Sequence, residues 1–129
     1  MIADTSFLVA LFIPEDELHN KAISLLETLK TKEILILDRV LEELFTVLTY
    51  KKGIIYSLEV LTKINKNKIF SIYNIDETES HLVLELATKL HKKLSFVDYA
   101  VISFTLKNND LLLCFDEEMN KLIKILKSK

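Results

Sequence analysis

The chain has 129 residues, half of them hydrophobic, and a formal net charge of -2 at pH 7. A chain of this length buries enough surface for one core, and we expect a single domain over residues 1–129. The single glycine and proline argue against linkers and low-complexity tails, and the lone Cys114 excludes an internal disulfide. No apolar run reaches the roughly 20 residues that span a bilayer, and the N-terminus lacks a secretory signal pattern. We therefore expect a cytoplasmic protein.

Lysine supplies the positive charge of this chain. All but one of the 17 basic residues are lysines, and the exception is Arg39. The overall charge gives no general attraction to nucleic acid, although it says little about any single face. The lysines cluster at 51–52, 63–68, 89–93 and 121–129. Solvated helix faces explain each cluster, and a local RNA-binding patch remains an alternative.

The first half of the chain begins with a short apolar strand. Segments with apolar residues at helical spacing follow it, and another short apolar run, ILIL, separates them. Pro14 ends one predicted helix, and Gly53 ends another that Asp38 can cap. The predicted elements are a strand at 1–3, a helix at 5–12, a helix at 16–30, a strand at 34–37 and a helix at 38–52.

The second half repeats this alternation. Asp76 and Glu79 have the spacing of a capping box and mark the start of one helix, and Ser95 opens the next. The predicted elements are a helix at 54–65, a strand at 69–75, a helix at 76–93, a helix at 95–107, a strand at 111–115 and a helix at 117–127. Strands that are apolar on both faces and separated by helices indicate an α/β fold with a parallel sheet between two helical layers.

In such a sheet the ligand crevice lies at the carboxyl ends of the strands. Asp4 directly follows the first strand, and Asp116 directly follows the strand LLLCF. Each can also be explained as the N-cap of the next helix. The sheet rule nevertheless places both carboxylates at the same end of the domain.

Two further acids lie close to apolar surfaces. Asp98 can form a capping box with Ser95, but the helix that it opens, YAVISFTL, is apolar nearly all round and must be buried. Glu43 borders the apolar stripe of its helix, whereas Glu42 points away from it; a glutamate at a core margin is the ordinary alternative. The acids that we assign to solvent are Glu15, Asp16, Glu17, Glu27, Glu33, Glu59 and Glu85.

Four carboxylates at one end of the domain would repel one another. At about 6 Å each pair is unfavourable by roughly 3 kcal/mol at an effective dielectric of about 20, against a domain stability of about 5 to 15 kcal/mol. A hard divalent cation is the natural compensation, and oxygen ligands without a His or Cys pattern favour Mg²⁺ or Mn²⁺. Such ions support phosphodiester hydrolysis by activated water.

The order of these acids resembles that of the PIN-domain nucleases, particularly the VapC-like toxins of prokaryotic toxin-antitoxin pairs. The matching stretches are DTS, EEL, SFVDYAVISF and LCFDEEM, and the resemblance covers essentially the whole chain. It implies a parallel five-stranded sheet and Mg²⁺- or Mn²⁺-dependent RNA cleavage. The metal-binding acids that it implies are Asp4, Glu43, Asp98 and Asp116.

The resemblance also assigns supporting roles and shows a departure. Thr5 and Ser6 match hydroxyl positions that orient the first aspartate, although both also fit a helix start. Cys114 stands where the family often has Thr or Ser, which implies that one hydrogen bond to the site is missing; we expect a buried structural thiol. A further acid or amide after Asp116 is typical of the family, and the candidates, which we leave unranked, are Glu117, Glu118 and Asn120.

Two other classes compete with a nuclease. A two-component receiver domain has a similar length and fold class, but adjacent acids after the first strand are missing here, since Ala3 and Thr5 flank Asp4. A catalytically silent PIN-like module that binds RNA or a protein is the stronger alternative. The resemblance implies an antitoxin partner and a homodimer. The aromatic residues that suit either an interface or the core are Phe7, Phe12, Phe45 and Tyr50.

Overall fold

The computed structural model describes residues 1–29 and 33–129. The elements in chain order are β1 (Ile2–Ala3), α1 (Thr5–Phe12), α2 (His19–Thr28), β2 (Ile34–Leu37), α3 (Asp38–Lys52), α4 (Ile54–Lys66), β3 (Phe70–Tyr73), α5 (Glu77–Leu90), α6 (Phe96–Lys107), β4 (Leu112–Leu113) and α7 (Glu117–Lys127). The predicted order of strands and helices is confirmed. The predicted end of the second helix, at residue 30, lies outside the described residues.

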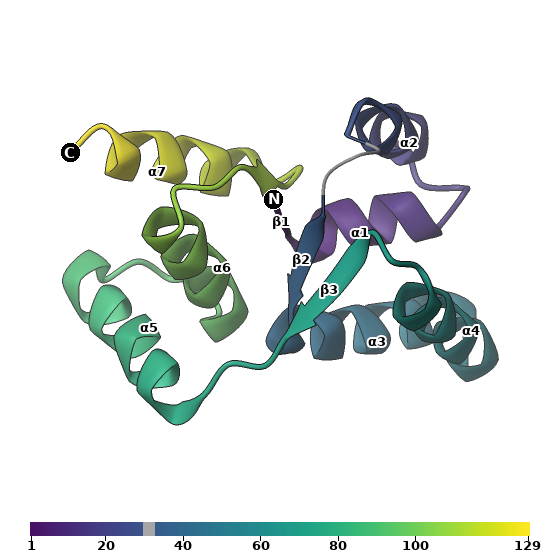
Figure 1. Ribbon diagram of the computed structural model, residues 1–129, viewed down its shortest axis with the longest axis horizontal. Coiled ribbons are helices and arrows are strands. Elements are labelled where there is room, and N and C mark those ends of the chain that lie inside the picture. Colours follow the sequence, from purple (N-terminus) through teal and green to yellow (C-terminus); the bar gives the residue numbers. More distant parts are fainter. Residues whose placement is uncertain (30–32) are drawn as a thin grey trace.

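The described strands form one parallel sheet in the order β3-β2-β1-β4. Helices α5, α6 and α7 cover one side of it, and α1 to α4 lie on the other (Figure 1). The α/β class and the three layers are therefore confirmed. The described sheet has four strands, one fewer than the five that the resemblance implied.

Both central strands are buried on both faces, as their unbroken apolar sequences predict. Ile2, Ala3, Ile34 and Ile36 have no exposed surface, and burying an aliphatic side chain of this size stabilises the fold by about 1.5 to 3 kcal/mol. Helix α6 is also buried over most of its length, which confirms the expectation from YAVISFTL. Its buried residues are Tyr99, Ala100, Val101, Ile102, Phe104 and Thr105.

Some elements are shorter than predicted. Strand β4 pairs only through Leu112 and Leu113 because its neighbour β1 offers only two residues, and β3 likewise matches the four residues of β2. Helix α2 begins at His19 rather than Asp16. The Asp16 carboxylate instead accepts the Leu18 amide hydrogen at 2.9 Å, so the chain forms a turn before the helix starts.

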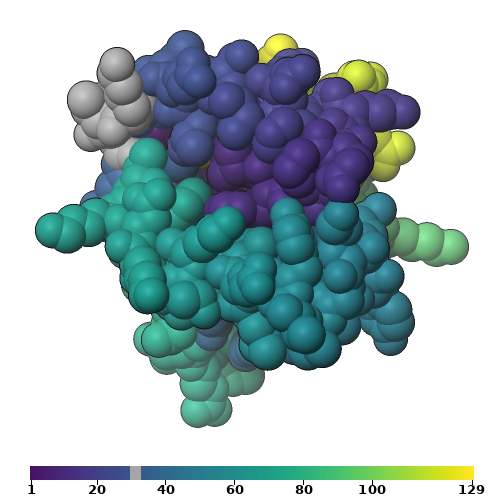
Figure 2. Space-filling model, turned by 90° about the vertical axis from the view of Figure 1, so that its right-hand side faces the viewer, coloured from purple at the N-terminus to yellow at the C-terminus, as the bar shows by residue number. Residues whose placement is uncertain are grey.

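The surface of the α1–α4 side carries several apolar residues. Figure 2 views this side, with the teal residues of α4 in its lower half. Of the four aromatic residues that suited core or interface, Phe7 is fully buried and Tyr50 is 87% exposed. Three apolar residues that follow Tyr50 closely in the sequence are also exposed, namely Ile54, Ile55 and Leu58. No helix among the described residues is long and apolar enough to cross a membrane.

Candidate active site

A cavity of about 450 Å³ collects the four predicted acids. It is lined by Asp4, Thr5, Ser6, Val9, Asp16, Leu18, Glu43, Asp98, Phe115 and Asp116. Residues separated by more than a hundred positions in sequence therefore share one concave surface. We name it the acid cavity.

Asp4 is held firmly at the end of β1. Its side chain is buried, and its Oδ2 accepts hydrogen bonds from the Ser6 hydroxyl at 2.9 Å and the Cys114 thiol at 3.3 Å. The Ser6 hydroxyl in turn accepts the Phe115 amide hydrogen at 3.0 Å. Ser6 thus ties the ends of β1 and β4 together while orienting Asp4, the supporting role that the resemblance assigned to it.

Cys114 supplies the contact that the resemblance implied would be missing. Burial raises the pKa of its thiol to about 12, and the negative charge of Asp4 adds to the rise. The group therefore remains a neutral S–H donor at neutral pH, and a thiol donates more weakly than a hydroxyl. Cys114 is half-buried. We interpret it as a donor to Asp4 rather than a nucleophile.

Asp116 lies at the start of α7, on an exposed part of the cavity wall. Its Oδ1 accepts the amide hydrogens of Glu118 at 3.0 Å and Met119 at 3.2 Å, as an N-cap does. Of the three later candidates, Asn120 donates to the Cys114 carbonyl at 3.0 Å. The lining of the acid cavity includes none of the three candidates, Glu117, Glu118 and Asn120.

Asp98 begins the buried helix α6 and forms the predicted capping box with Ser95. Its Oδ2 accepts the Ser95 amide hydrogen at 3.2 Å, and its own amide donates to the Ser95 hydroxyl at 3.1 Å. Burial raises the pKa of Asp98, the hydrogen bonds from Ser95 lower it, and the charges of Asp4 and Asp116 raise it again. The net pKa lies above the usual value, mainly because the carboxyl group is partly buried.

Glu43 is the half-buried acid of its pair, as predicted from the helical pattern. It lines the acid cavity and accepts no hydrogen bond from a described residue. Glu42 is 68% exposed and lies 3.6 Å from the Arg39 guanidinium. The two neighbouring glutamates of α3 therefore have different surroundings, one facing the cavity and one facing solvent.

For three of these acids, a role in helix capping is compatible with a role in the candidate site. Asp4 and Asp116 are helix N-caps, Asp98 is the partner of the N-cap Ser95 in a capping box, and each of the three acids also lines the acid cavity. A capping carboxylate is fixed by backbone amides at one oxygen, which leaves lone pairs of the group for another ligand. Capping therefore positions these acids rather than competing with their use.

One acid of the cavity was missed. Asp16 was assigned to solvent, but it is half-buried and lines the acid cavity from the turn between α1 and α2. No local signal distinguishes it, because Glu15 and Glu17 flank it and both are exposed. Only the return of the chain after the short helix α1 brings Asp16 beside the end of β1.

The donors of the acid cavity suit a hard cation. All its charged groups are carboxylates, and the hydroxyl of Thr5, which also lines it, is buried with no hydrogen-bond partner among the described residues. Among the residues that the structure describes, no group of three or more His, Cys, Asp or Glu side chains is arranged to hold a metal ion as it stands. This arrangement fits Mg²⁺, which commonly takes one or two protein carboxylates and keeps several waters.

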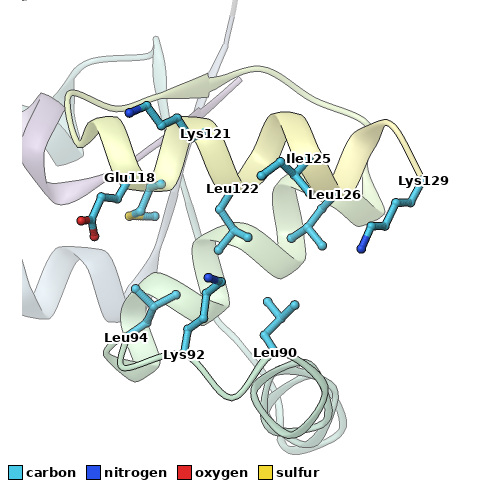
Figure 3. Close-up of a pocket in the computed structure, with 10 residues that line it drawn as sticks. Leu90, Lys92, Leu94, Glu118, Lys121, Leu122, Ile125, Leu126 and Lys129 are labelled. Atoms are coloured by element: carbon cyan, nitrogen blue, oxygen red, sulfur yellow. The ribbon is translucent and has the colours of Figure 1, made fainter.

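A second cavity of about 460 Å³ has the opposite lining. Leu122 and Leu126 of α7 point toward Leu90 at the end of α5 and Leu94 of the α5–α6 connection (Figure 3). We name this the leucine groove. Its edges carry lysines, and Glu118 is its only acid, so it offers no set of groups for acid–base or metal chemistry. The acid cavity is therefore the candidate active site.

The parallel sheet between helices and the carboxylate-lined cavity place this chain among α/β proteins with an acidic site. The PIN domain family model matches residues 1–125, and the chain belongs to that family. Comparison with curated protein sequences finds no match.

Two solved structures share the fold. The first is the VapC20 toxin of Mycobacterium tuberculosis, described as sarcin-ricin loop cleaving, with 20% identity, a TM-score of 0.82, and coverage of 94% of this chain and 93% of that chain. The second is VapBC2 of Rickettsia felis bound to a promoter DNA fragment, with 18% identity, a TM-score of 0.70, and coverage of 93% and 90%.

Proposed function

We propose that this chain is a divalent-metal-dependent endoribonuclease of the cytoplasm and the toxin of a toxin-antitoxin pair. The observation that carries the proposal is the convergence of Asp4, Glu43, Asp98 and Asp116 on one cavity. Membership of the PIN domain family and the shared fold with VapC toxins support it.

Each acid has a defined part in this proposal. Asp4, Glu43, Asp98 and Asp116 would hold Mg²⁺ or Mn²⁺, and Asp4 is oriented for it by Ser6 and Cys114. The bound cation supplies a lowered pKa for water and charge neutralisation at the phosphate. Glu43 accepts no hydrogen bond from a described residue, so its oxygens are available to accept a proton from water.

The proposed protein partners are an antitoxin and a second copy of the chain. The VapBC2 structure gives a precedent for a toxin assembled with its antitoxin. The exposed apolar residues at the end of α3 and on α4 offer surface for a protein partner, because exposed apolar surface is typical of interaction sites. These residues are Tyr50, Ile54, Ile55 and Leu58.

A cleavage assay on RNA with Mn²⁺ tests the proposal. Asp4→Asn and Asp98→Asn keep the shape and the capping acceptor, and each should slow cleavage by roughly 100-fold or more because one charged ligand is lost. Glu43→Gln should also lose activity, whereas Glu42→Gln is the matched control and should cleave like the wild type. Cleavage unaffected by Asp4→Asn and Asp98→Asn would end the catalytic assignment and favour a silent PIN-like binding module.

A further inference from the structure

The acid cavity is unfavourable for the substrate that we propose for it. Five carboxylates line it, and its lining includes no Lys, Arg or His. An RNA backbone carries one negative charge per phosphate, and a single divalent ion would offset only two of the five negative charges. If the proposed function holds, positive side chains near the mouth must help to bring the phosphate in.

Lys21 is the lysine that the structure places against the cavity wall. It lies in the first turn of α2, is exposed, and its Nζ lies 5.7 Å from the centroid of the Phe115 ring. Phe115 itself lines the acid cavity. In the described part of the chain Lys21 forms no ion pair, whereas Lys52 is paired with Glu15 at 2.6 Å. The charge of Lys21 is therefore available to a ligand.

Phe115 provides a fixed platform for this ammonium group. Its amide donates to the Ser6 hydroxyl at 3.0 Å, and its ring packs against buried Phe7 with centroids 5.9 Å apart. The attraction of an exposed ammonium to an aromatic face is weak. It favours positions of Lys21 beside the cavity while leaving the ammonium hydrogens free to donate to phosphate oxygens.

We infer that Lys21 is a positioning residue that binds a phosphate of the RNA backbone at the mouth of the acid cavity. The inference rests on the proposed function. A lysine acts as a point charge and reads no base, so this contact is independent of RNA sequence. It should strengthen RNA binding and lower KM, with little effect on kcat once the strand is bound.

Salt dependence provides the test, because it counts phosphate contacts. Binding of a short fluorescein-labelled single-stranded RNA is measured by anisotropy from 50 to 200 mM salt, with Ca²⁺ replacing Mg²⁺ and strand integrity checked on a gel. One lost phosphate contact lowers the slope of log K against log salt by about 0.7. Over this range, wild-type affinity should then fall about 2.6-fold more than that of Lys21→Ala.

Two variants control for charge and for geometry. Lys107→Ala removes the same charge from the exposed end of α6, nine residues and about 14 Å along the helix from Asp98. It should keep the wild-type slope. Lys21→Arg keeps a cation over the ring and should retain most of the affinity, which a merely structural role of the lysine stem would not explain.

The outcomes separate this inference from the proposed function. A reduced slope and raised KM in Lys21→Ala alone, with kcat within about twofold, would support the inference. Equal slopes in Lys21→Ala and Lys107→Ala, with RNA still bound and cleaved, would overturn it and leave the nuclease assignment intact. Failure of the wild type to bind or cleave RNA would overturn both.

Discussion

The acid cavity and the leucine groove have nearly equal volumes, about 450 and 460 Å³, and opposite linings. Most residues that line the groove are apolar, and the partial burial of their side chains is favourable without any further ligand. The acid cavity gathers five carboxylates, whose like charges oppose their association. The size of a cavity therefore says little about its use, whereas an arrangement that opposes stability indicates function.

The largest expected contrast comes from one substitution in each cavity. Leu122→Ala removes a buried groove side chain and should destabilise the fold by about 2 to 3 kcal/mol, lowering Tm by roughly 10 °C. Its cleavage rate at temperatures well below Tm should match the wild type. Asp98→Asn should do the reverse, with cleavage lost and the metal-free Tm raised, because the cost of burying a charged carboxylate and its repulsion by Asp4 and Asp116 are both relieved.

Thermal denaturation without metal, together with the RNA cleavage assay, measures both halves of this contrast. A fall in Tm for Asp98→Asn would show that its carboxylate stabilises the metal-free fold through its Ser95 contacts more than its burial and repulsion destabilise the fold. That result would remove the energetic argument for a cation.

Metal binding gives the next largest effect. At ten times its Kd, a cation that binds only the folded state stabilises the protein by about 1.4 kcal/mol, which raises Tm by about 5 °C in a domain of this size. Leu122→Ala should show the same rise from its lower baseline, and Asp98→Asn should show none. A wild-type Tm that does not change in millimolar Mg²⁺ or Mn²⁺ would contradict a cation site shared by these carboxylates.

The pH dependence of the metal-free protein should show a smaller effect, which arises from the burial of Asp98 and from the nearby charges of Asp4 and Asp116. The pKa of Asp98 is raised in the folded protein above the reference value of 3.8, so the folded state holds its proton more tightly than the unfolded chain does. Its unfavourable contribution is absent below pH 3.8 and develops as the pH rises through the folded-state pKa. The Tm advantage of Asp98→Asn at pH 7 should therefore shrink as the pH approaches 4.

Denaturation of both proteins in parallel without metal checks this prediction, since groups remote from Asp98 titrate equally in each. An advantage that is constant between pH 4 and 7 would mean that the carboxylate charge of Asp98 is not what the substitution relieves.

The sequence was sufficient for the parts of the fold that follow from local pattern. The capping boxes at Asp76 and Ser95 were recognisable because their spacing is fixed by a single helical turn. The orientation of Glu43 followed from the 100° advance of a helix. The lengths of β3 and β4 could not be predicted, because a ladder extends only as far as the neighbouring strand allows, and that depends on distant residues.

The candidate site was predictable where the sheet rule or a local helical pattern applied, and not where distant segments meet. Asp4 and Asp116 follow strands, and the sequence shows this directly. The contact between Lys21 and Phe115, and the thiol donor of Cys114 to Asp4, join segments about a hundred residues apart and have no sequence signal. Asp16 belongs with them, since only the path of the chain after α1 carries it to the acid cavity.

Asp16 tests how far the acid cavity extends and should give the smallest effect. Its carboxylate is half-buried and already accepts the Leu18 amide hydrogen, so we expect it to act on a cation through its charge rather than as a main ligand. Such a charge contributes up to about 1 kcal/mol to cation binding in a well-hydrated setting. Asp16→Asn should therefore raise the Mg²⁺ concentration for half-maximal cleavage by about fivefold or less, and saturating Mg²⁺ should restore the rate.

Exposed Glu17 supplies the control, since Glu17→Gln should leave the Mg²⁺ titration unchanged. A rate for Asp16→Asn that stays as low as that of Asp98→Asn at saturating Mg²⁺ would place Asp16 among the residues that hold the cation directly.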